Sequence, residues 1–277
     1  MITLEDINII IEEIKKNNSR ECINIVIEEN NSLNLTDSKF GGLPYISTDS
    51  DTPKDSNGNQ LALLAQINCS NLPENTLYPK EGLLQFWISR NDDFGLGNKK
   101  DYYVKYIKNI ENNITKESIL NKYKLLDEEN REEYSPFNKK NTSFALKFEK
   151  GISTITSTDF LFEDIALKTI HELLPDENIE DLYDDLERDV FNTLFKAFSG
   201  VDHAIGAYPT FTQWDPRNPE EKDAYGITLL QVESYWNNDS NSSGIMWGDS
   251  GVANFFINKE KLEHLNFEDV LFNWDCF

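Results

Sequence analysis

Apolar residues recur along this chain with two different spacings, and each spacing predicts a different kind of element. Over residues 3–17 isoleucine occurs repeatedly at every third or fourth position, which is typical of a helix with one buried face. Thr3, with Asp6 three residues later, supplies the capping box that begins such a helix. Helices are also predicted near 117–129, 160–173 and 178–198, the last with an apolar stripe along one face.

Short segments that are rich in β-branched and aromatic residues, and bounded by turn-forming residues, predict strands. They lie at 23–29, 62–68, 83–89, 102–107, 144–149, 152–158, 227–233, 251–257 and 269–274. Residues 108–142 are polar and rich in Asn, Lys and Glu, which favours an irregular connection. The pattern predicts an α+β protein with a mainly antiparallel sheet and peripheral helices.

Two parts of the chain repeat the same order of motifs. At an offset of 165 residues "KFGGLPY" (39–45) aligns with "AIGAYPT" (204–210), and Gln66 aligns with Gln231. At an offset of 169 "LYPKEGLLQFWI" (77–88) aligns with "MWGDSGVANFFI" (246–257), and the four extra residues fall in the polar loop 236–243. A fixed order of matching motifs indicates an internal repeat. We therefore predict a duplication of β-rich halves, about 23–107 and 144–277, joined by 108–142 within one compact body of residues 1–277.

The charge of the chain bears on its partners. It carries 49 Asp and Glu against 26 Lys and Arg, a formal net charge of −23. Such a surface repels phosphate groups, and no basic stripe offsets it, so neither nucleic acid nor an anionic membrane is an expected partner. A basic protein would be attracted. The alternative is that the acidity only maintains solubility.

The motifs that the sequence has and lacks indicate the expected compartment and cofactors. Acidic residues within the first twenty positions are unlike a secretory signal, and no apolar run reaches the roughly 18 residues that cross a bilayer. The three cysteines lack the spacing of a disulfide framework or a zinc site. We expect a cytoplasmic protein without a metal or another cofactor, because no Gly-rich phosphate loop or paired Cys/His motif occurs.

The tetrapeptide Gly-Asp-Ser-Gly at 248–251 is also found around the nucleophile of trypsin-like proteases. A serine nucleophile needs a base within hydrogen-bonding distance and an oxyanion hole. The repeat aligns Ser250 with Glu81, in a turn that leads into a strand, and Val252 stands where the protease motif has another glycine. We therefore interpret Ser250 as a turn residue and assign no catalytic residue.

Polar and aromatic residues that stand out from their surroundings are candidates for binding a ligand or a partner. They are Gln66, Gln213, Trp214, Asp215, Arg217, Gln231, Trp247 and Asp249. Those between 213 and 217 lie in a proline-bounded loop, where a ring, an amide and a charge pair would suit a polar ligand or a peptide. The alternatives are structural: the loop satisfies its own charges, and the two strand glutamines bond to neighbouring loops.

Five segments together resemble the YwqG-like family of bacterial proteins, a domain of unknown function. They are "SKFGGLPY", "LLAQIN", "GLLQFWI", "GAYPTFTQWDPR" and "IMWGDSGVANFFI", and the resemblance covers about 38–107 and 143–275. It implies a cytoplasmic bacterial protein with an α+β fold that contains a duplication, and it implies no reaction, cofactor or catalytic residue. Some relatives are encoded among polymorphic-toxin and immunity genes, which implies a binding role.

The favoured hypothesis is a non-catalytic acidic binding protein that sequesters a protein partner, as an immunity protein does. The alternative is an enzyme or a small-molecule binder with a polar cleft between the halves. The residues that would line that cleft are Gln231, Trp214, Asp215, Arg217, Trp247 and Asp249, with Asp249 as its acid or base. A deep polar cleft at this place would favour the alternative, whereas a filled interface would count against it.

Overall fold

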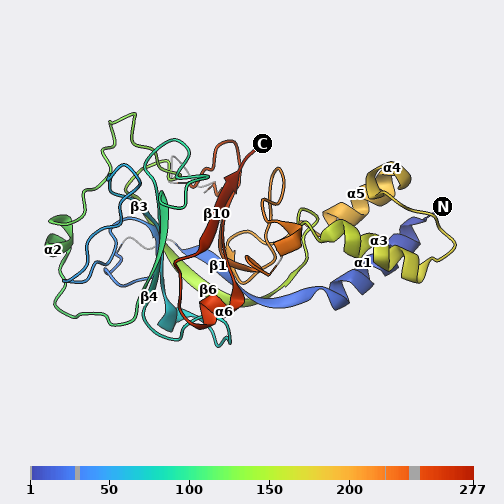
Figure 1. Ribbon diagram of the computed structural model, residues 1–277, viewed down its shortest axis with the longest axis horizontal. Helices are drawn as coiled ribbons and strands as arrows, with labels where there is room; N and C mark the ends of the chain where they lie inside the picture. The colour runs from blue at the N-terminus through green and yellow to red at the C-terminus, as the bar shows by residue number, and fades with distance from the viewer. Residues whose placement is uncertain (1, 29–31, 222, 237–243) are drawn as a thin grey trace.

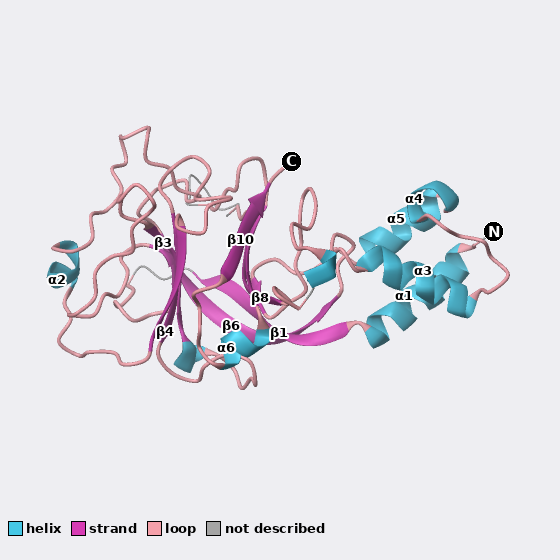
Figure 2. Cartoon of the chain, in the orientation of Figure 1, coloured by secondary structure: helices cyan, strands magenta, loops and turns pink. Residues whose placement is uncertain are grey.

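The computed structural model describes residues 2–28, 32–221, 223–236 and 244–277, and within them the chain is an α+β protein. The described strands are β1 (Ser19–Glu28), β2 (Lys39–Gly41), β3 (Ala62–Asn68), β4 (Leu83–Ile88), β5 (Tyr102–Ile107), β6 (Ser143–Thr154), β7 (Ala204–Ile205), β8 (Ile227–Glu233), β9 (Val252–Ile257) and β10 (Val270–Asp275). The described α-helices are α1 (Leu4–Asn17), α2 (Lys116–Leu120), α3 (Phe162–Leu173), α4 (Leu182–Asp185), α5 (Arg188–Lys196) and α6 (Lys259–Glu263). Most strands gather at one end of the molecule, and α1, α3, α4 and α5 lie at the other (Figure 1; Figure 2).

One antiparallel sheet contains all the described strands, in the order β10-β9-β8-β7-β1-β6-β2-β3-β4-β5. The long strands β1 and β6 pair with each other in the middle of this order. The sheet curls until its outer strands meet. There Tyr102 Oη of β5 donates to Val270 O of β10 at 3.0 Å. Four strands therefore lie on either side of the central pair.

Apolar side chains from both sides of the sheet fill its interior. Strands β4 and β9 are buried along their whole length, which explains their continuous apolar runs. The rings of Phe86 in β4 and Phe255 in β9 lie edge to face, with centroids 5.1 Å apart. The two sides thus share one apolar core.

A second apolar cluster lies in the helical lobe, which we define as α1, α3, α4 and α5. As predicted, α1 begins at the capping box: Asp6 N donates to Thr3 Oγ1 at 3.2 Å, and Thr3 N donates to Asp6 Oδ2 at 2.9 Å. The isoleucine face of α1 is buried and packs on α3 and α5. None of the described helices has the length and apolar character needed to cross a membrane.

The two sides of the sheet match in the details of their hydrogen bonding. The register of β3 with β4 shifts between Leu63 and Ala65, and that of β8 with β9 shifts between Thr228 and Leu230, 165 positions later in each case. A β-bulge is a specific local irregularity, so its recurrence at the same offset relates the two ladders closely.

The two strand glutamines also make matching bonds. Gln66 Oε1 accepts from Tyr45 N at 3.0 Å, and its Nε2 donates to two carbonyl oxygens of the loop before β2. Gln231 Oε1 accepts from Thr210 N at 2.8 Å, and its Nε2 donates to two carbonyl oxygens of the loop before β7. Each amide therefore ties its strand to the Gly-x-x-Pro turn and to the loop that precedes it.

The central strands extend this correspondence and interlock the two sides. Next to β2, Leu146 N of β6 donates to Ser38 O at 3.2 Å, and next to β7, Ile25 N of β1 donates to His203 O at 2.8 Å. Position i of β1 thus corresponds to position i+121 of β6. Since β1 precedes β2 in the chain but pairs with β7, and β6 precedes β7 but pairs with β2, each side borrows its inner strand from the other part of the chain.

Two predicted helices are wrong in extent. Residues 178–198 form α4 and α5 instead of one helix, because Leu186 and Glu187 between them are extended, with ψ of 139° and 144°. Of 117–129 only α2 is helical, since Lys122 Nζ beyond it donates to carbonyl oxygens of the loop 47–50 and ties the chain there. The helix predicted at 160–173 begins at Phe162.

The predicted strands 144–149 and 152–158 fall in one strand, β6, because its pairing with β1 continues through Gly151, but β6 ends at Thr154 and residues 155–158 are not part of it. A Cβ atom at Gly151 would lie 2.7 Å from Asn24 Nδ2, so a larger residue there would displace the Asn24 side chain. Strand β1 begins at Ser19 instead of 23, and residue 29, its predicted end, lies outside the described residues. Most of the loop 236–243, where the two alignments differ by four residues, also lies outside them.

Candidate functional site

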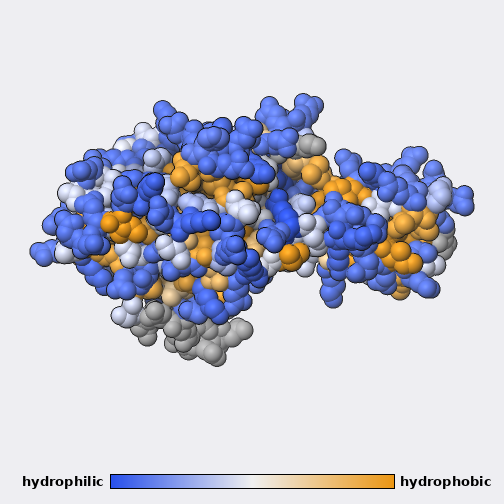
Figure 3. Space-filling view, turned by 90° about the horizontal axis from the view of Figure 1, so that it is seen from below, coloured by the Kyte–Doolittle hydropathy of each residue, from blue (hydrophilic) through white to orange (hydrophobic). Residues whose placement is uncertain are grey.

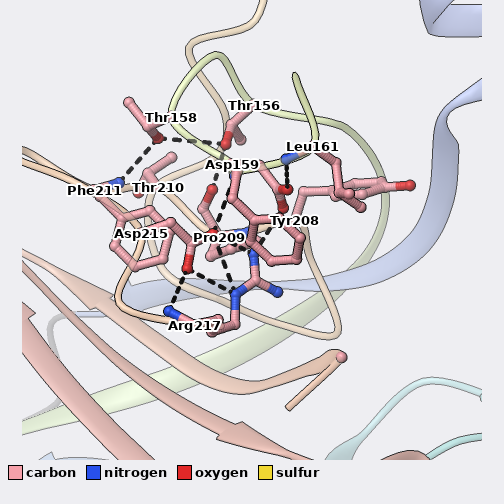
Figure 4. Close-up of polar contacts among 12 residues, drawn as sticks. Thr156, Thr158, Asp159, Leu161, Tyr208, Pro209, Thr210, Phe211, Asp215 and Arg217 are labelled. Atoms are coloured by element: carbon pink, nitrogen blue, oxygen red, sulfur yellow. Dashed lines mark hydrogen bonds and ion pairs between the residues drawn. The ribbon is translucent and has the colours of Figure 1, made fainter. Parts of the chain in front are cut away.

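Arg217 and Asp215, predicted as candidates in the proline-bounded loop, belong to a buried ion cluster with Asp159 (Figure 4). Arg217 Nη2 lies 2.6 Å from Asp215 Oδ2 and 2.9 Å from Asp159 Oδ2, and each of the three side chains is at most 6% exposed. The rings of Phe160 and Phe256 flank the guanidinium, with centroids 4.8 and 5.0 Å from its carbon. Burial opposes the charge of Arg217, but the bonds to Asp215 and the charge of Asp159 outweigh burial and raise the pKa of Arg217.

This cluster joins the helical lobe to the loop 208–217. Asp159 lies three residues before α3 begins, and Phe160 N donates to Asp215 Oδ2 at 3.2 Å. Two further bonds fasten the same segments, from Thr156 Oγ1 to Pro209 O at 2.5 Å and from Phe211 N to Thr158 Oγ1 at 3.1 Å (Figure 4). The charges are matched inside the protein, so a ligand could reach Asp215 or Arg217 only by breaking the cluster.

The other two candidates of this loop lie at the surface. Gln213 N donates to Asp275 Oδ2 at 2.8 Å, and Gln213 Nε2 donates to Cys276 O at 2.7 Å, so this residue anchors the loop to the end of β10. The side chain of Trp214 is 70% exposed.

Trp247, Asp249 and Ser250 lie in and beside a turn before β9. Trp247 is fully buried, 5.4 Å from the ring of Phe94, and its indole N–H has no acceptor among the described residues. Asp249 and Ser250 are exposed, and Ser250 has φ +59° within the turn. Gln66 and Gln231 are buried and bonded to loops as described above. The structure therefore distributes the eight predicted residues over several places, and aromatic packing fills the interior between the two sides.

A groove that the sequence analysis did not identify lies where both sides of the sheet meet β1, and we call it the junction groove. It has a volume of about 540 Å³, and β1, the loop 74–78, β6 and the end of β7 form its walls. None of the eight predicted residues lines it. At one wall Tyr78 Oη crosses to the other side of the sheet and donates to Thr228 O at 3.1 Å.

Charged side chains around the junction groove differ from the rest of this acidic chain. Arg20, Lys150 and Lys259 line it together with Glu21 and Glu74. The guanidinium of Arg20 lies over the ring of Tyr208 in the loop after β7, with its carbon 4.0 Å from the ring centroid. Gly206 borders the groove and aligns with Gly41 in the sequence, and this alignment was the signal that could have pointed to it. Which residues cover each glycine depends on the fold.

Exposed carboxylates are concentrated in one stretch of the helical lobe. Between 172 and 189 eight exposed carboxylates form what we call the acidic face: Glu172, Asp176, Glu180, Asp181, Asp184, Asp185, Glu187 and Asp189. Two of them organise the backbone, since Asp181 caps α4 and Asp185 Oδ2 accepts from Glu180 N at 2.7 Å. The backbone bonds from Glu180 and Asp181 lower the pKa of Asp185.

The acidic face also presents a large aromatic side chain. Tyr183 is 78% exposed, and its ring lies edge to face with that of Phe191, with centroids 5.6 Å apart. Within the described residues no ion pair reaches Asp176, Glu180 or Asp184. Hydrophilic residues with separate apolar patches also cover the side of the lobe shown in Figure 3.

A third group, near the end of β8, titrates unusually. His203 is buried, and its Nδ1 accepts from Glu233 N at 3.0 Å, which places the ring proton on Nε2. Burial lowers the pKa of His203 to about 4. Burial, the charge of Asp202 and a hydrogen bond with Asp202 raise the pKa of Glu233. At the corresponding place beside β3, Asn68 N donates to Ser38 Oγ at 2.9 Å, so the two sides share this bond but differ in titratable chemistry.

Comparison with known proteins shows the family of the chain. A search of curated proteins finds no significant match. The family model DUF1963, described as a domain of unknown function, matches residues 38–276, which include β2 through β10. The matched residues therefore comprise most of the sheet and most of the helical lobe, and the chain belongs to the DUF1963 family.

Proposed function

We propose that this chain is a cytoplasmic, non-catalytic binding protein whose acidic face takes up a basic segment of a protein partner. The observation that carries the proposal is the concentration of eight exposed carboxylates within eighteen residues, around the exposed ring of Tyr183. A surface of one sign attracts a partner of the other sign and raises the rate of encounter. An aromatic ring at its centre supplies the contact area that charges alone do not.

Several of the eight residues singled out in the sequence stabilise the fold and do not contribute to this proposed binding surface. Asp215 and Arg217 are used in the buried ion cluster, and Gln66 and Gln231 are used in tying strands to loops. These observations also weigh against an enzyme whose cleft these side chains would line. Trp214 remains a candidate contact for a partner because its ring is exposed.

The experiment compares two variants of equal net charge. One carries Asp176→Asn, Glu180→Gln, Asp184→Asn and Glu187→Gln on the acidic face. The control carries Asp92→Asn, Glu129→Gln, Glu132→Gln and Glu268→Gln, which are exposed residues outside the helical lobe. Binding of a labelled peptide of alternating Lys and Ala residues is measured by fluorescence anisotropy at several salt concentrations.

We expect the first variant to bind the peptide about tenfold more weakly than the control, because local charge density and not total charge attracts the peptide. Binding to the wild type should weaken as salt shortens the screening length to about 8 Å near physiological ionic strength. Equal binding by the two variants would contradict the proposal, since net charge alone would then explain the attraction.

We further propose that the partner is a protein that the chain sequesters, as an immunity protein does for a toxin. The resemblance of five segments to YwqG-like proteins supports this assignment, and we infer that the chain is one of them. The test is co-expression with the product of each neighbouring gene. Sequestration would be supported if the wild type restores growth of cells that express a toxic neighbouring gene product and the acidic-face variant does not. It would be contradicted if neither protein restores growth.

We infer that the two sides of the sheet arose by duplication of a β-rich half. The matching bulges, the matching glutamine bonds and the exchange of β1 and β6 support this inference. An exchanged inner strand is the arrangement expected when two copies that could associate as a dimer become joined in one chain.

A further inference from the structure

The junction groove has a counterpart on the other side of the sheet, and there the chain itself fills it. The correspondence aligns Gly206 with Gly41 and the loop 75–78 with residues 244–247. It also aligns Ile23 of β1 with Phe144 of β6, through the offset of 121 positions established above. Both places therefore have the same three walls: an inner strand, a glycine after a short strand, and a loop before a buried strand.

In the filled counterpart, the extended segment 136–138 pairs with the loop. Met246 N donates to Pro136 O at 2.7 Å, and Asn138 N donates to Gly244 O at 3.2 Å. The ring of Phe137 between them is buried, with its centroid 6.0 Å from that of Phe144. A Cβ atom on Gly41 would lie 2.9 Å from the Phe137 ring, so the ring lies directly on this glycine.

At the junction groove no described segment takes this place. A Cβ atom on Gly206 would have no neighbour nearer than the ring of Tyr78, at 3.7 Å. The difference arises because the chain enters β6 through 136–142, whereas it enters β1 from α1, which leads away into the helical lobe (Figure 1). Apolar side chains stay open to the groove as a result, among them Ile152, which is 66% exposed.

We propose that the junction groove binds an extended peptide segment of a partner protein, with a large apolar side chain at the position that Phe137 occupies in the counterpart and an acidic residue beside it. The backbone N–H that corresponds to Met246 N is that of Leu77, which donates to Asn75 Oδ1 at 3.2 Å, so the groove would hold the segment through its side chains. The volume of about 540 Å³ is in the range of ligand sites. This site is separate from the acidic face and does not depend on the function proposed for it.

Charge complementarity supports the acidic residue. Lys150 lies opposite Ile23 on the sheet face that borders the groove, it is exposed, and no ion pair is seen to it among the described residues. Lys259 has only a distant pair, 3.8 Å from Glu263 on its own helix. In a chain of net charge −23, the groove is lined by three cations, Arg20, Lys150 and Lys259, against two carboxylates, Glu21 and Glu74, and this local excess attracts an acidic peptide.

The test uses the full chain and two labelled peptides. ESPFDE flanks the Ser-Pro-Phe of residues 135–137 with acidic residues, and in ESPADE alanine replaces the phenylalanine. Ile152→Asp and Lys150→Glu change the groove. Lys147→Glu is the matched control, because successive residues of a strand face opposite sides and Lys147, three positions before Lys150, therefore lies on the other face of β6. Anisotropy measures binding, and circular dichroism establishes that each variant melts within a few degrees of the wild type.

We expect ESPFDE to bind the wild type saturably, and ESPADE to bind about tenfold more weakly because the anchor is missing. Ile152→Asp and Lys150→Glu should each weaken ESPFDE about tenfold, while Lys147→Glu should stay within about twofold. The acidic-face variant should bind this peptide at least as well as the wild type, so the two proposals can fail separately. Absence of binding at about 1 mM peptide, equal binding of the two peptides, or indifference to both groove variants would overturn the proposal.

Discussion

At the scale of single residues, buried charge is the main feature of this protein. The cluster of Arg217, Asp215 and Asp159 lies almost entirely out of water and satisfies itself. His203 and Glu233 are also largely shielded from water, but their environments hold the first neutral and favour the protonated form of the second. These residues connect local chemistry to stability in different ways.

Arg217→Met should destabilise the protein by about 3–5 kcal/mol, because it leaves two buried carboxylates without their partner. Urea denaturation of the variant and the wild type measures this. Lys16→Met is the control, since Lys16 and Glu13 form an exposed pair that is expected to contribute about 0.5 kcal/mol or less. A loss below about 1 kcal/mol for Arg217→Met would show that the cluster matters little for folding.

Glu233→Gln should stabilise the protein increasingly as the pH rises above about 4.5, the ordinary pKa of a glutamic acid. The raised pKa means that the folded chain keeps a proton that the unfolded chain has lost, so wild-type stability falls with rising pH in this range. The gain should reach about 1 kcal/mol near neutral pH, allowing for the part of the side chain in contact with water.

The lowered pKa of His203 changes the stability with pH in the opposite direction, and the same experiment measures it. Its pKa of about 4 means that between pH 4 and 6.5 the unfolded chain binds a proton that the folded chain does not, so stability rises with pH. Denaturation midpoints from pH 4.5 to 7.5 should therefore rise more steeply in Glu233→Gln than in the wild type. Parallel curves would contradict the raised pKa of Glu233.

At the scale of elements, the two sides of the sheet use the same devices. Each has a bulge at the same offset, a glutamine that ties a strand to the Gly-x-x-Pro turn, and an inner strand taken from the other part of the chain. The motifs are visible in the sequence, but the bonds from the glutamines to the turns are not, because the partner atoms lie more than twenty residues away.

Gln66→Leu and Gln231→Leu should each destabilise the protein by about 1–3 kcal/mol, because each leaves one backbone N–H and two carbonyl groups of a loop without a partner. The loss at Gln66 should be at least as large as that at Gln231, because Gln66 Oε1 also accepts from Gln85 Nε2 at 2.8 Å. Gln213→Ala, at the surface, is the control. Chemical denaturation checks the result, and a large loss in only one of the two buried positions would count against their equivalence.

At the scale of the whole molecule, two apolar clusters share one chain. The larger fills the sheet and the smaller fills the helical lobe. The lobe is attached through β1, through β6 and through the Arg217 cluster. Such an arrangement favours local opening of the lobe before the sheet unfolds.

Ile14→Ala should remove about 2–5 kcal/mol from the stability of the helical lobe, because Ile14 is fully buried between its helices. Hydrogen exchange read by mass spectrometry should show faster exchange in α1, α3 and α5, with β3, β4 and β9 unchanged. Equal acceleration in the sheet would show that the two clusters unfold as one unit.

The sequence by itself determined the features that depend on neighbouring residues. The capping box of α1, the continuous apolar runs of β4 and β9, and the turn at Ser250 all depend on side chains within a few positions. The helix over 178–198 was predicted too long because the apolar stripe continues through a break in the backbone. The stripe reports burial, and burial is compatible with more than one local conformation.

Only the tertiary structure decided which distant groups meet. Asp159 reaches Arg217 across 58 positions, and β1 pairs with β7 instead of the strand that follows it. The same long-range pairing fills one of two equivalent grooves with Phe137 and leaves the junction groove open. Pairing over such distances depends on the free energy of the whole packed core, and no local pattern in the sequence records it.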